Sequence, residues 1–461
     1  MTATASVFGA PQAFMQAGTS QPPLLPVPIT KAEPTVTASG TNNVTVSTNL
    51  VEKILGLQIP DALANGKFNL NVRLRYEQVD EEGAPGITKD SYAPTIRTRF
   101  GYTSAPLYGF QAMAEAVNVS VIGPEHNYNA AGSNGQPQRP VVADPPLTRI
   151  DQAWLAYTNL NWISAKAGEQ QINLDNQRFI GDSAWRQNMQ TFGAANVGSE
   201  PIKDLNLYYS YVWDVHRVYG NVSGLPPANT DFQSDSSLIN LCYSGWKYGR
   251  FVAYSYLLGL KNGAGYANSC ATYGGYFAGN APVNKGMAFN YRTEFAWQTA
   301  YGNSPLEYGT HYYNLEGGAN IKPVAIGGGY EDLGSGVNSG AGGGRASFRT
   351  PLATLHAFNG WDDVFLTTPT AGLRDLYGYF QVTLPEQVPV RFICHKFNAD
   401  YGSGNYGQEF DVIASKKFGK YWITTLKYAY YQGQDAAPGS TLATAPHVDV
   451  QKFWAQVEFI F

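Results

Sequence analysis

The sequence predicts an all-β fold, a transmembrane antiparallel β-barrel of about 18 strands with short turns at one end and long loops at the other. Three observations support this prediction. The chain ends on an alternating aromatic strand, and similar alternating segments recur from residue 67 onward. No apolar run reaches the ~18 residues that a helical membrane span needs.

The last strand is the strongest of these observations. Residues 450–461 read VQKFWAQVEFIF, with Gln456 and Glu458 on one face. The opposite, apolar face is formed by Phe453, Ala455, Val457, Phe459 and Phe461. A barrel closes its last strand onto its first and turns such a face to lipid, whereas an exposed apolar edge invites aggregation. An edge strand of a soluble β-domain is the alternative.

The composition is typical of a barrel with aromatic girdles and many turns. The 461 residues include 31 Tyr, 23 Phe, 9 Trp and 49 Gly. The formal net charge of −4 argues against a nucleic-acid binder, because such proteins are typically strongly basic. Cys242, Cys270 and Cys394 lie far apart and form no disulfide framework.

The chain divides at about residue 67. Residues 1–66 are predicted to be a Pro/Thr-rich leader, mostly disordered, with a possible short helix over residues 48–64 or an ordinary linker there. Residues 67–461 are predicted to form the barrel. Residues 1–17 make a poor signal peptide, because they contain no Lys or Arg and no continuous apolar core.

Alternating strands and short turns follow one another through residues 67–461. At about 22 residues for each strand and its connection, this length holds about 18 strands. The sequence has no fixed-period repeat, which a β-helix or a propeller would show. The clearest strands span 68–77, 96–102, 110–119, 205–213, 239–243, 251–259, 289–297, 378–384, 390–394, 410–414 and 421–431, with short turns at 105–109, 245–249, 385–387 and 417–420 and a long loop at 120–147.

Two longer stretches have a familiar pattern. Residues 168–192 read GEQQINLDNQRFIGDSAWRQNMQTF, and residues 350–377 read TPLATLHAFNGWDDVFLTTPTAGLRDLY. Together with the terminal aromatic strand they resemble the alginate export family of outer-membrane porins, over about residues 67–461. The resemblance implies a monomeric barrel of about 18 strands whose arginine-rich lumen passes an anionic polysaccharide.

Four arginines share the inward parity of the first two strands: Arg73, Arg75, Arg97 and Arg99. If Arg73 stands opposite Arg97, the two like charges need a counter-charge. We expect Glu115 opposite Arg97, and we expect Glu458 to reach the first strand across the barrel closure. The group is either an arginine ladder for anions, since guanidinium binds carboxylates bidentately, or a set of salt bridges that braces the wall.

Further arginines are candidates for the pore lining. Arg178 and Arg186 lie in the first family-like stretch, where they either line a constriction or tie a loop to the wall. Arg292 and Arg391 share the inward parity of later strands. Acids share this parity as well, so the lumen is expected to be of mixed charge: Glu77, Glu115, Glu294, Glu316, Glu409, Asp411 and Glu458.

Other motifs have structural explanations. Gly181-Asp182-Ser183 resembles an esterase nucleophile block but lacks its Asp-x-x-His partner, and the glycine tract at 334–344 lacks the end of a phosphate loop and is expected to be a mobile extracellular loop. The six histidines show no ligand spacing, so His356 is expected to pack in a loop. A Ca²⁺ site at Asp362 and Asp363 lacks the support of an acidic repeat.

We therefore expect a passive outer-membrane porin that conducts an anionic solute, such as a uronate-type polysaccharide like alginate. The alternatives are uptake of small anions or oligosaccharides, or a structural barrel that scaffolds a partner. We expect no enzyme activity, no cofactor, no metal and no nucleic acid. The expected partners are outer-membrane lipid, the solute and the barrel-assembly machinery, and the expected state is a monomer.

Overall fold

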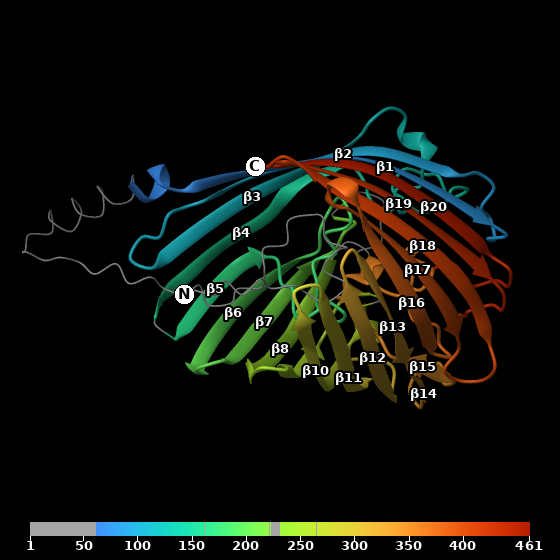
Figure 1. The fold of residues 1–461 in the computed structure, drawn as a ribbon. Helices are drawn as coiled ribbons and strands as arrows, with labels where there is room; N and C mark the ends of the chain where they lie inside the picture. Colours follow the sequence, from blue (N-terminus) through green and yellow to red (C-terminus); the bar gives the residue numbers. More distant parts are fainter. Residues whose placement is uncertain (1–60, 161, 221, 223–230, 264) are drawn as a thin grey trace, which may run out of the picture.

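Eighteen strands form one closed antiparallel sheet in the computed structural model, which describes residues 61–160, 162–220, 222, 231–263 and 265–461 (Figure 1). Each barrel strand pairs with its neighbours in the chain, and β20 (Asp449–Ile460) pairs with β1 (Lys67–Glu82) to close the barrel. Blue β1 and red β20 lie side by side at the top of Figure 1. The predicted fold class is confirmed.

The strands between β1 and β20 follow the chain in order. They are β2 (Ser91–Thr103), β3 (Phe110–Val121), β4 (Leu147–Leu160), β5 (Ile163–Gln170), β6 (Thr191–Ile202), β7 (Leu205–His216), β8 (Asp231–Trp246), β9 (Gly249–Leu258), β10 (Cys270–Asn284), β11 (Met287–Ala300), β12 (Gly309–Ile321), β13 (Val324–Leu333), β16 (Leu373–Leu384), β17 (Val388–Asn398), β18 (Asn405–Phe418) and β19 (Trp422–Gly433).

The helical elements are short. They are η2 (Glu125–Asn127), α3 (Gly265–Asn268), η3 (Leu355–Ala357) and η4 (Pro385–Gln387), with a helical turn at residues 61–64. Among the described residues no helix is long and apolar enough to cross a membrane. The turn at 61–64 falls within the range of the possible helix over residues 48–64, and residues 1–60 of the predicted leader lie outside the described residues.

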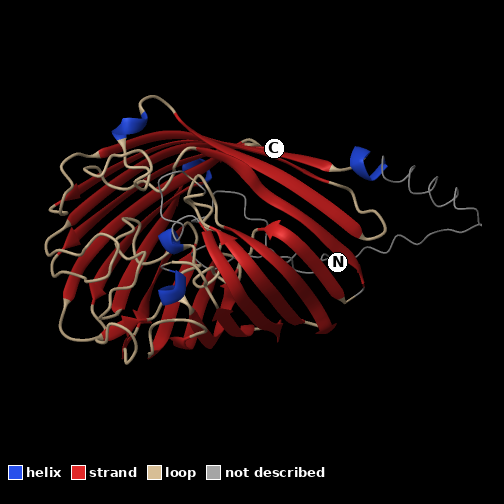
Figure 2. Cartoon of the chain, turned by 180° about the vertical axis from the view of Figure 1, so that it is seen from behind, coloured by secondary structure: helices blue, strands red, loops and turns tan. Residues whose placement is uncertain are grey.

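Short turns and long loops occupy opposite ends of the barrel. The turns include 104–109, 247–248, 385–387 and 419–421, close to the predicted positions. Figure 2 shows the loops, in tan, gathered at the other end. The glycine tract at 334–344 is a loop there, and it carries the small hairpin of β14 (Ser335–Val337) and β15 (Arg345–Ser347).

Side chains alternate between the two faces of the wall. On β1, Leu74 is 45% exposed, whereas its neighbours Arg73 and Arg75 are 2% and 1% exposed. On β20, Phe453 and Val457 face outward and Glu458 is fully buried, as the period of two predicts. A closed barrel with an apolar outer face and a polar lumen is the form that is stable in lipid.

Candidate functional site: the loop-filled lumen

Two loops from the long-loop end fold into the barrel and contact the inward side chains of the wall. We call residues 171–190, between β5 and β6, inner loop 1, and residues 348–372, between β15 and β16, inner loop 2. The loops also contact each other, because the Gly181 amide donates to the Leu352 carbonyl oxygen at 2.8 Å. The two stretches that carry the family resemblance therefore form the lumen loops.

The seam between β1, β2 and β20 confirms two predicted neighbours. Arg73 stands opposite both Arg97 and Glu458 in the strand pairing. One carboxylate oxygen of Glu458 lies 3.2 Å from Arg73 Nη2 and 3.0 Å from Arg97 Nη2. Asn71 Nδ2 donates to the same oxygen at 2.8 Å. Glu458 is thus the counter-charge that two adjacent arginines share.

The predicted position of Glu115 is wrong. Glu115 stands opposite Gly101, four residues along β2 from Arg97. The turn closes with the amide of Ser104 donating to the Ala112 carbonyl oxygen, so more residues lie in the turn than the sequence pattern indicated and the pairing shifts. Glu115 accepts hydrogen bonds from Asn69 and from Gln152, the latter at 3.1 Å.

Arg99, the fourth arginine of the predicted ladder, forms an ion pair with a different acid. Arg99 pairs with Asp151 of β4, with 3.0 Å between Nε and Oδ2. Arg99 is 3% exposed and Asp151 is fully buried, so this pair also belongs to the interior of the wall and loops.

The arginines of β1 hold inner loop 1 against the wall. Arg73 Nη1 donates to the carbonyl oxygens of Ala184 at 3.0 Å and Trp185 at 3.1 Å. Arg75 Nη2 donates to the Trp185 carbonyl oxygen at 2.5 Å, and its guanidinium lies 4.2 Å from the centre of the Trp185 ring. Inner loop 1 covers both arginines. They therefore brace the wall and the loop, which is the second of the two roles considered for them. Their contact with a passing solute stays a prediction.

The other end of inner loop 1 binds the opposite wall through Asp175. Its carboxylate accepts hydrogen bonds from Tyr276 at 2.8 Å, Tyr256 at 3.0 Å and Asn240 at 2.9 Å. Asp175 has a φ of 56°, a left-handed conformation that Asp tolerates better than most residues. Inner loop 1 therefore spans the lumen from the seam to β8, β9 and β10.

Arg178 and Arg186 form ion pairs within the lumen. Arg178 Nε lies 2.7 Å from Glu331 of β13. Arg186 bridges Glu77 of β1, at 3.1 Å, and Asp363 of inner loop 2, at 2.6 Å. Burial opposes the charge of Arg186, but the two carboxylates outweigh it and raise its pKa above the ordinary value. The two roles predicted for Arg178 and Arg186 were to line a constriction or to tie a loop to the wall. These contacts fit the second role.

Inner loop 2 contacts a buried lysine, Lys427, that the sequence analysis did not identify. Lys427 Nζ of β19 lies 2.6 Å from His356 Nε2 and 3.7 Å from the centre of the Trp361 ring. Trp185 stacks on His356 with 4.6 Å between ring centres. The only sequence signal for Lys427 is its inward parity on an aromatic strand.

His356 is held neutral in this cluster. Its Nδ1 lies 2.7 Å from Asp363, so Nδ1–H donates to the carboxylate while Nε2 accepts from Lys427. Burial keeps the pKa of His356 well below its ordinary value, although the Asp363 charge acts in the opposite sense. Asp363 also pairs with Lys452 of β20 at 2.9 Å. His356 is a loop packing residue, as expected.

Arg391 borders a cavity of about 60 Å³ between inner loop 2 and the wall. Its Nε donates to Gln381 at 3.0 Å, and its guanidinium lies 4.9 Å from the centre of the Tyr379 ring. Bare backbone at Gly317 and Gly328 forms part of the lining. The remaining polar lining residues are Asn290, Asn314, Glu316, Asn359, Tyr377, Asp375, Glu331 and His395.

Arg292 lies next to this cavity and is paired with an acid. Its Nη2 is 2.6 Å from Glu294, and its guanidinium lies 3.7 Å from the centre of the Tyr276 ring. The predicted mixture of charges is therefore present: the seven acids of the inward parity are all buried on the lumen side.

One group of potential metal ligands occurs among the described residues. Ligand atoms of His311, Asp332 and Asp400 lie within 4.8 Å of one another at the long-loop end. Arg374 pairs with Asp332 at 3.2 Å and with Asp400 at 2.6 Å, so a guanidinium already occupies a position between the two carboxylates. The group is an ion-pair network around Arg374.

The fold is similar to that of solved bacterial outer-membrane proteins. OpdK of Pseudomonas aeruginosa, in a structure with vanillate, gives a TM-score of 0.63 at 12% sequence identity, covering 87% of this chain and 99% of OpdK. OccAB3 of Acinetobacter baumannii gives 0.64 at 15% identity, covering 86% of this chain and 100% of OccAB3. OpdL of P. aeruginosa gives 0.59 at 14% identity, with 87% and 99% covered. No family model and no curated protein matches the sequence. At these identities the likeness shows the fold alone.

Proposed function

We propose that the chain is a passive outer-membrane porin that conducts a small anionic solute. The observation that carries this proposal is a closed barrel with an apolar outside whose polar lumen is narrowed by two ion-paired loops. The likeness to outer-membrane barrels supports the location. A wall of fixed charges lowers the barrier for a charged solute, and diffusion down a gradient needs no cofactor.

The loops favour a small solute. Inner loops 1 and 2 bury the arginines of the seam, whereas Arg391 borders the cavity between inner loop 2 and the wall. Guanidinium groups bind carboxylates through paired hydrogen bonds. The OpdK structure contains vanillate, a small aromatic carboxylate.

A uronate-type polysaccharide is the second candidate cargo. The stretches that resemble the alginate export family, residues 168–192 and 350–377, coincide with inner loops 1 and 2. A sugar polymer would need both loops to move off the wall, which breaks the Arg186–Asp363 ion pair between them. Export and uptake of such a cargo are both compatible with a passive pore.

Planar-bilayer recording tests the proposal. We expect ion conductance, a reversal potential in a KCl gradient that indicates anion preference, and current block by a small carboxylate at lower concentration than by an oligouronate. The reverse order of block favours the polysaccharide. A folded protein that shows no conductance would refute the porin and favour a scaffold.

A matched pair of variants assigns the anion preference to the lumen cavity. Arg391→Gln removes the guanidinium charge from a cavity that is also lined by acids, and we expect it to lower the anion preference. Arg374→Gln removes the same charge from the long-loop end, where the Arg374 side chain is 41% exposed, and we expect a smaller change. Equal effects of the two variants would assign the preference to the overall charge of the protein.

A further inference from the structure

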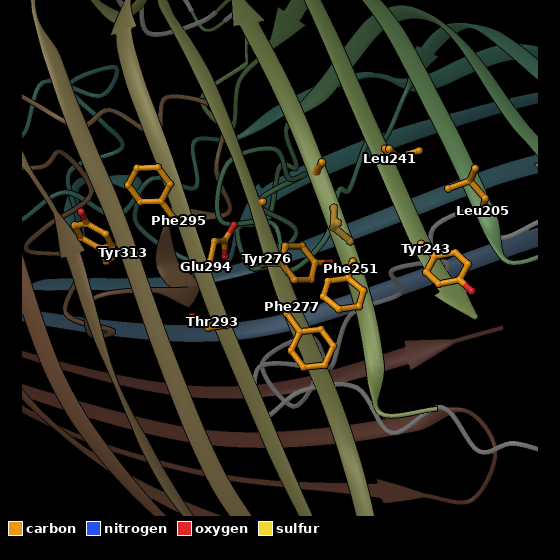
Figure 3. Close-up of a pocket in the computed structure, with 13 residues that line it drawn as sticks. Leu205, Leu241, Tyr243, Phe251, Tyr276, Phe277, Thr293, Glu294, Phe295 and Tyr313 are labelled. Carbon is orange, nitrogen blue, oxygen red and sulfur yellow. The ribbon is translucent and has the colours of Figure 1, made fainter. Parts of the chain in front are cut away.

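A depression of about 670 Å³ interrupts the outward face of the barrel between β7 and β12 (Figure 3). Its floor is nearly bare, because Ala253 of β9 and Gly275 of β10 stand opposite each other and carry little or no side chain. Leu241 and Phe295 flank this pair on the neighbouring strands. The lining is mainly apolar, and its polar groups belong to Thr293, Glu294 and three tyrosines.

The depression reaches toward the short-turn end of the barrel. Phe251 and Phe277 stand opposite each other below its floor, with 4.6 Å between ring centres. Leu205 and Tyr243 form the next outward pair, and both belong to strands that end in short turns. The depression is therefore an apolar groove that opens beside the turns at residues 203–204 and 247–248.

Two short turns near this side of the barrel carry an exposed lysine and no acid, and the turn of Lys247 adjoins the groove. Lys247 lies between β8 and β9, Lys285 lies between β10 and β11, and both are exposed. Lys247 Nζ lies 4.6 Å from the centre of the Tyr248 ring. Trp246 stacks on Phe251 at 5.5 Å, which places an interfacial aromatic pair at the same level. The two turns are roughly 15–20 Å apart, because two strands separate them and the Lys285 turn lies about five residues further along β10 than the level of Tyr248, which is beside Gly279.

Exposed lysines alone do not distinguish this side of the barrel. Exposed lysines also occur around the rest of the short-turn end, at Lys67, Lys322, Lys417 and Lys420, and Lys203 lies beside the groove but shares its turn with Asp204. On the opposite side of the barrel, Lys420 lies 5.0 Å from the centre of the Tyr421 ring, in the same arrangement as Lys247. What distinguishes Lys247 is the groove directly above its turn.

We propose that this side of the barrel binds an anionic phospholipid. One acyl chain lies in the groove over Ala253 and Gly275, and the phosphate lies at Lys247. Snorkelling lysines beside an aromatic girdle sit at the depth of lipid phosphates, and each contributes about fivefold to binding of an anionic lipid. The inference depends on insertion in a bilayer, which conductance checks independently.

Tryptophan quenching by brominated lipids tests the site with an internal control. Trp246 stands at the groove and Trp422 stands beside Lys420 and Tyr421 on the opposite side. Their signals are isolated by comparing the protein with Trp246→Phe and Trp422→Phe variants. The vesicles are phosphatidylcholine containing either brominated phosphatidylglycerol or brominated phosphatidylcholine.

We expect the preference for phosphatidylglycerol to be several-fold higher at Trp246 than at Trp422. Lys247→Gln is expected to abolish the excess preference for phosphatidylglycerol at Trp246, while Lys285→Gln and Lys417→Gln/Lys420→Gln leave it unchanged. Ala253→Leu, which fills the groove, is expected to lower the excess with all lysines in place. Conductance of each variant verifies that it has folded and inserted.

Equal preferences at Trp246 and Trp422 would overturn the proposal, because they would indicate a general attraction by the basic rim. A loss of the excess in the Lys417→Gln/Lys420→Gln protein would do the same. If Ala253→Leu leaves the excess intact, the groove is not the acyl-chain site and the proposal fails on that ground.

Discussion

Glu458→Gln is the substitution for which the structure makes the sharpest prediction. Glu458 is fully buried, and one of its oxygens serves both Arg73 and Arg97. These arginines stand directly opposite each other on β1 and β2. Glutamine keeps the shape and one acceptor oxygen but removes the charge, so two neighbouring guanidinium groups lose the carboxylate that they share.

The expected loss of stability follows from the contact distances. At 3.2 Å and 3.0 Å, each pair has a Coulomb energy of about 5 kcal/mol at an effective dielectric constant of ~20. Desolvation offsets much of this energy in the native protein. Removing one partner of a buried ion pair costs about 3–5 kcal/mol, because the other charges stay buried. We therefore expect Glu458→Gln to lower the free energy of unfolding by about 3–5 kcal/mol.

Urea unfolding in phospholipid vesicles, followed by tryptophan fluorescence, measures this loss. Glu386→Gln is the control: its carboxylate pairs with Lys416 at the short-turn end and is 76% exposed, so we expect no measurable change. Adding Arg97→Gln to Glu458→Gln removes the repulsion and is expected to restore about 1–3 kcal/mol. A Glu458→Gln protein as stable as the native one, or a double variant no more stable than Glu458→Gln, would refute the shared counter-charge.

Two further substitutions test how the inner loops are held. Asp175→Asn keeps the left-handed backbone but replaces one acceptor oxygen with a donor amide, so we expect a loss of about 1–3 kcal/mol and noisier single-channel current as inner loop 1 loosens. Asp204→Asn, at a short-turn aspartate with a φ of 67°, is the matched control, and equal noise in both variants would contradict the tether. His356→Gln tests the neutral histidine. The folded state holds the pKa of His356 well below its ordinary value of 6.5, so below about pH 6.5 the unfolded state binds more protons and the free energy of unfolding falls as the pH drops. We expect this slope, at most ~1.4 kcal/mol per pH unit for one histidine, to be shallower in His356→Gln. Urea titrations between pH 7.5 and about 5 measure it, and identical slopes would show that His356 is not the group responsible.

The period of two was enough to predict the wall. It placed Glu458 and Gln456 inward and Phe453 outward, because in a strand one residue in two meets each face. It also supported the pairing of Arg73 with both Arg97 and Glu458. It did not locate Glu115, since the pairing of β2 with β3 depends on how many residues the turn takes up, and the alternation carries no information on that.

The interior of the lumen was much less predictable. The contacts of Lys427 with His356 and of Asp175 with Tyr276 join segments distant in sequence through space that the loops fill. Inner loops 1 and 2 have no regular periodicity, so their course cannot be read from spacing. The family-like stretches pointed to the correct segments, yet they gave no indication that the seam arginines would bind loop carbonyl oxygens.

The Arg73–Glu458 pair also bears on how the barrel assembles. Its partners are 385 residues apart, close to the full length of the barrel, so the pair can form only when the last strand reaches the first. Until then Arg73 and Arg97 lack their counter-charge, and Arg73 cannot yet hold inner loop 1 in its final place. Closure of the wall and docking of the loop would therefore occur together, late and cooperatively, and an unfinished barrel would keep a charged, open edge.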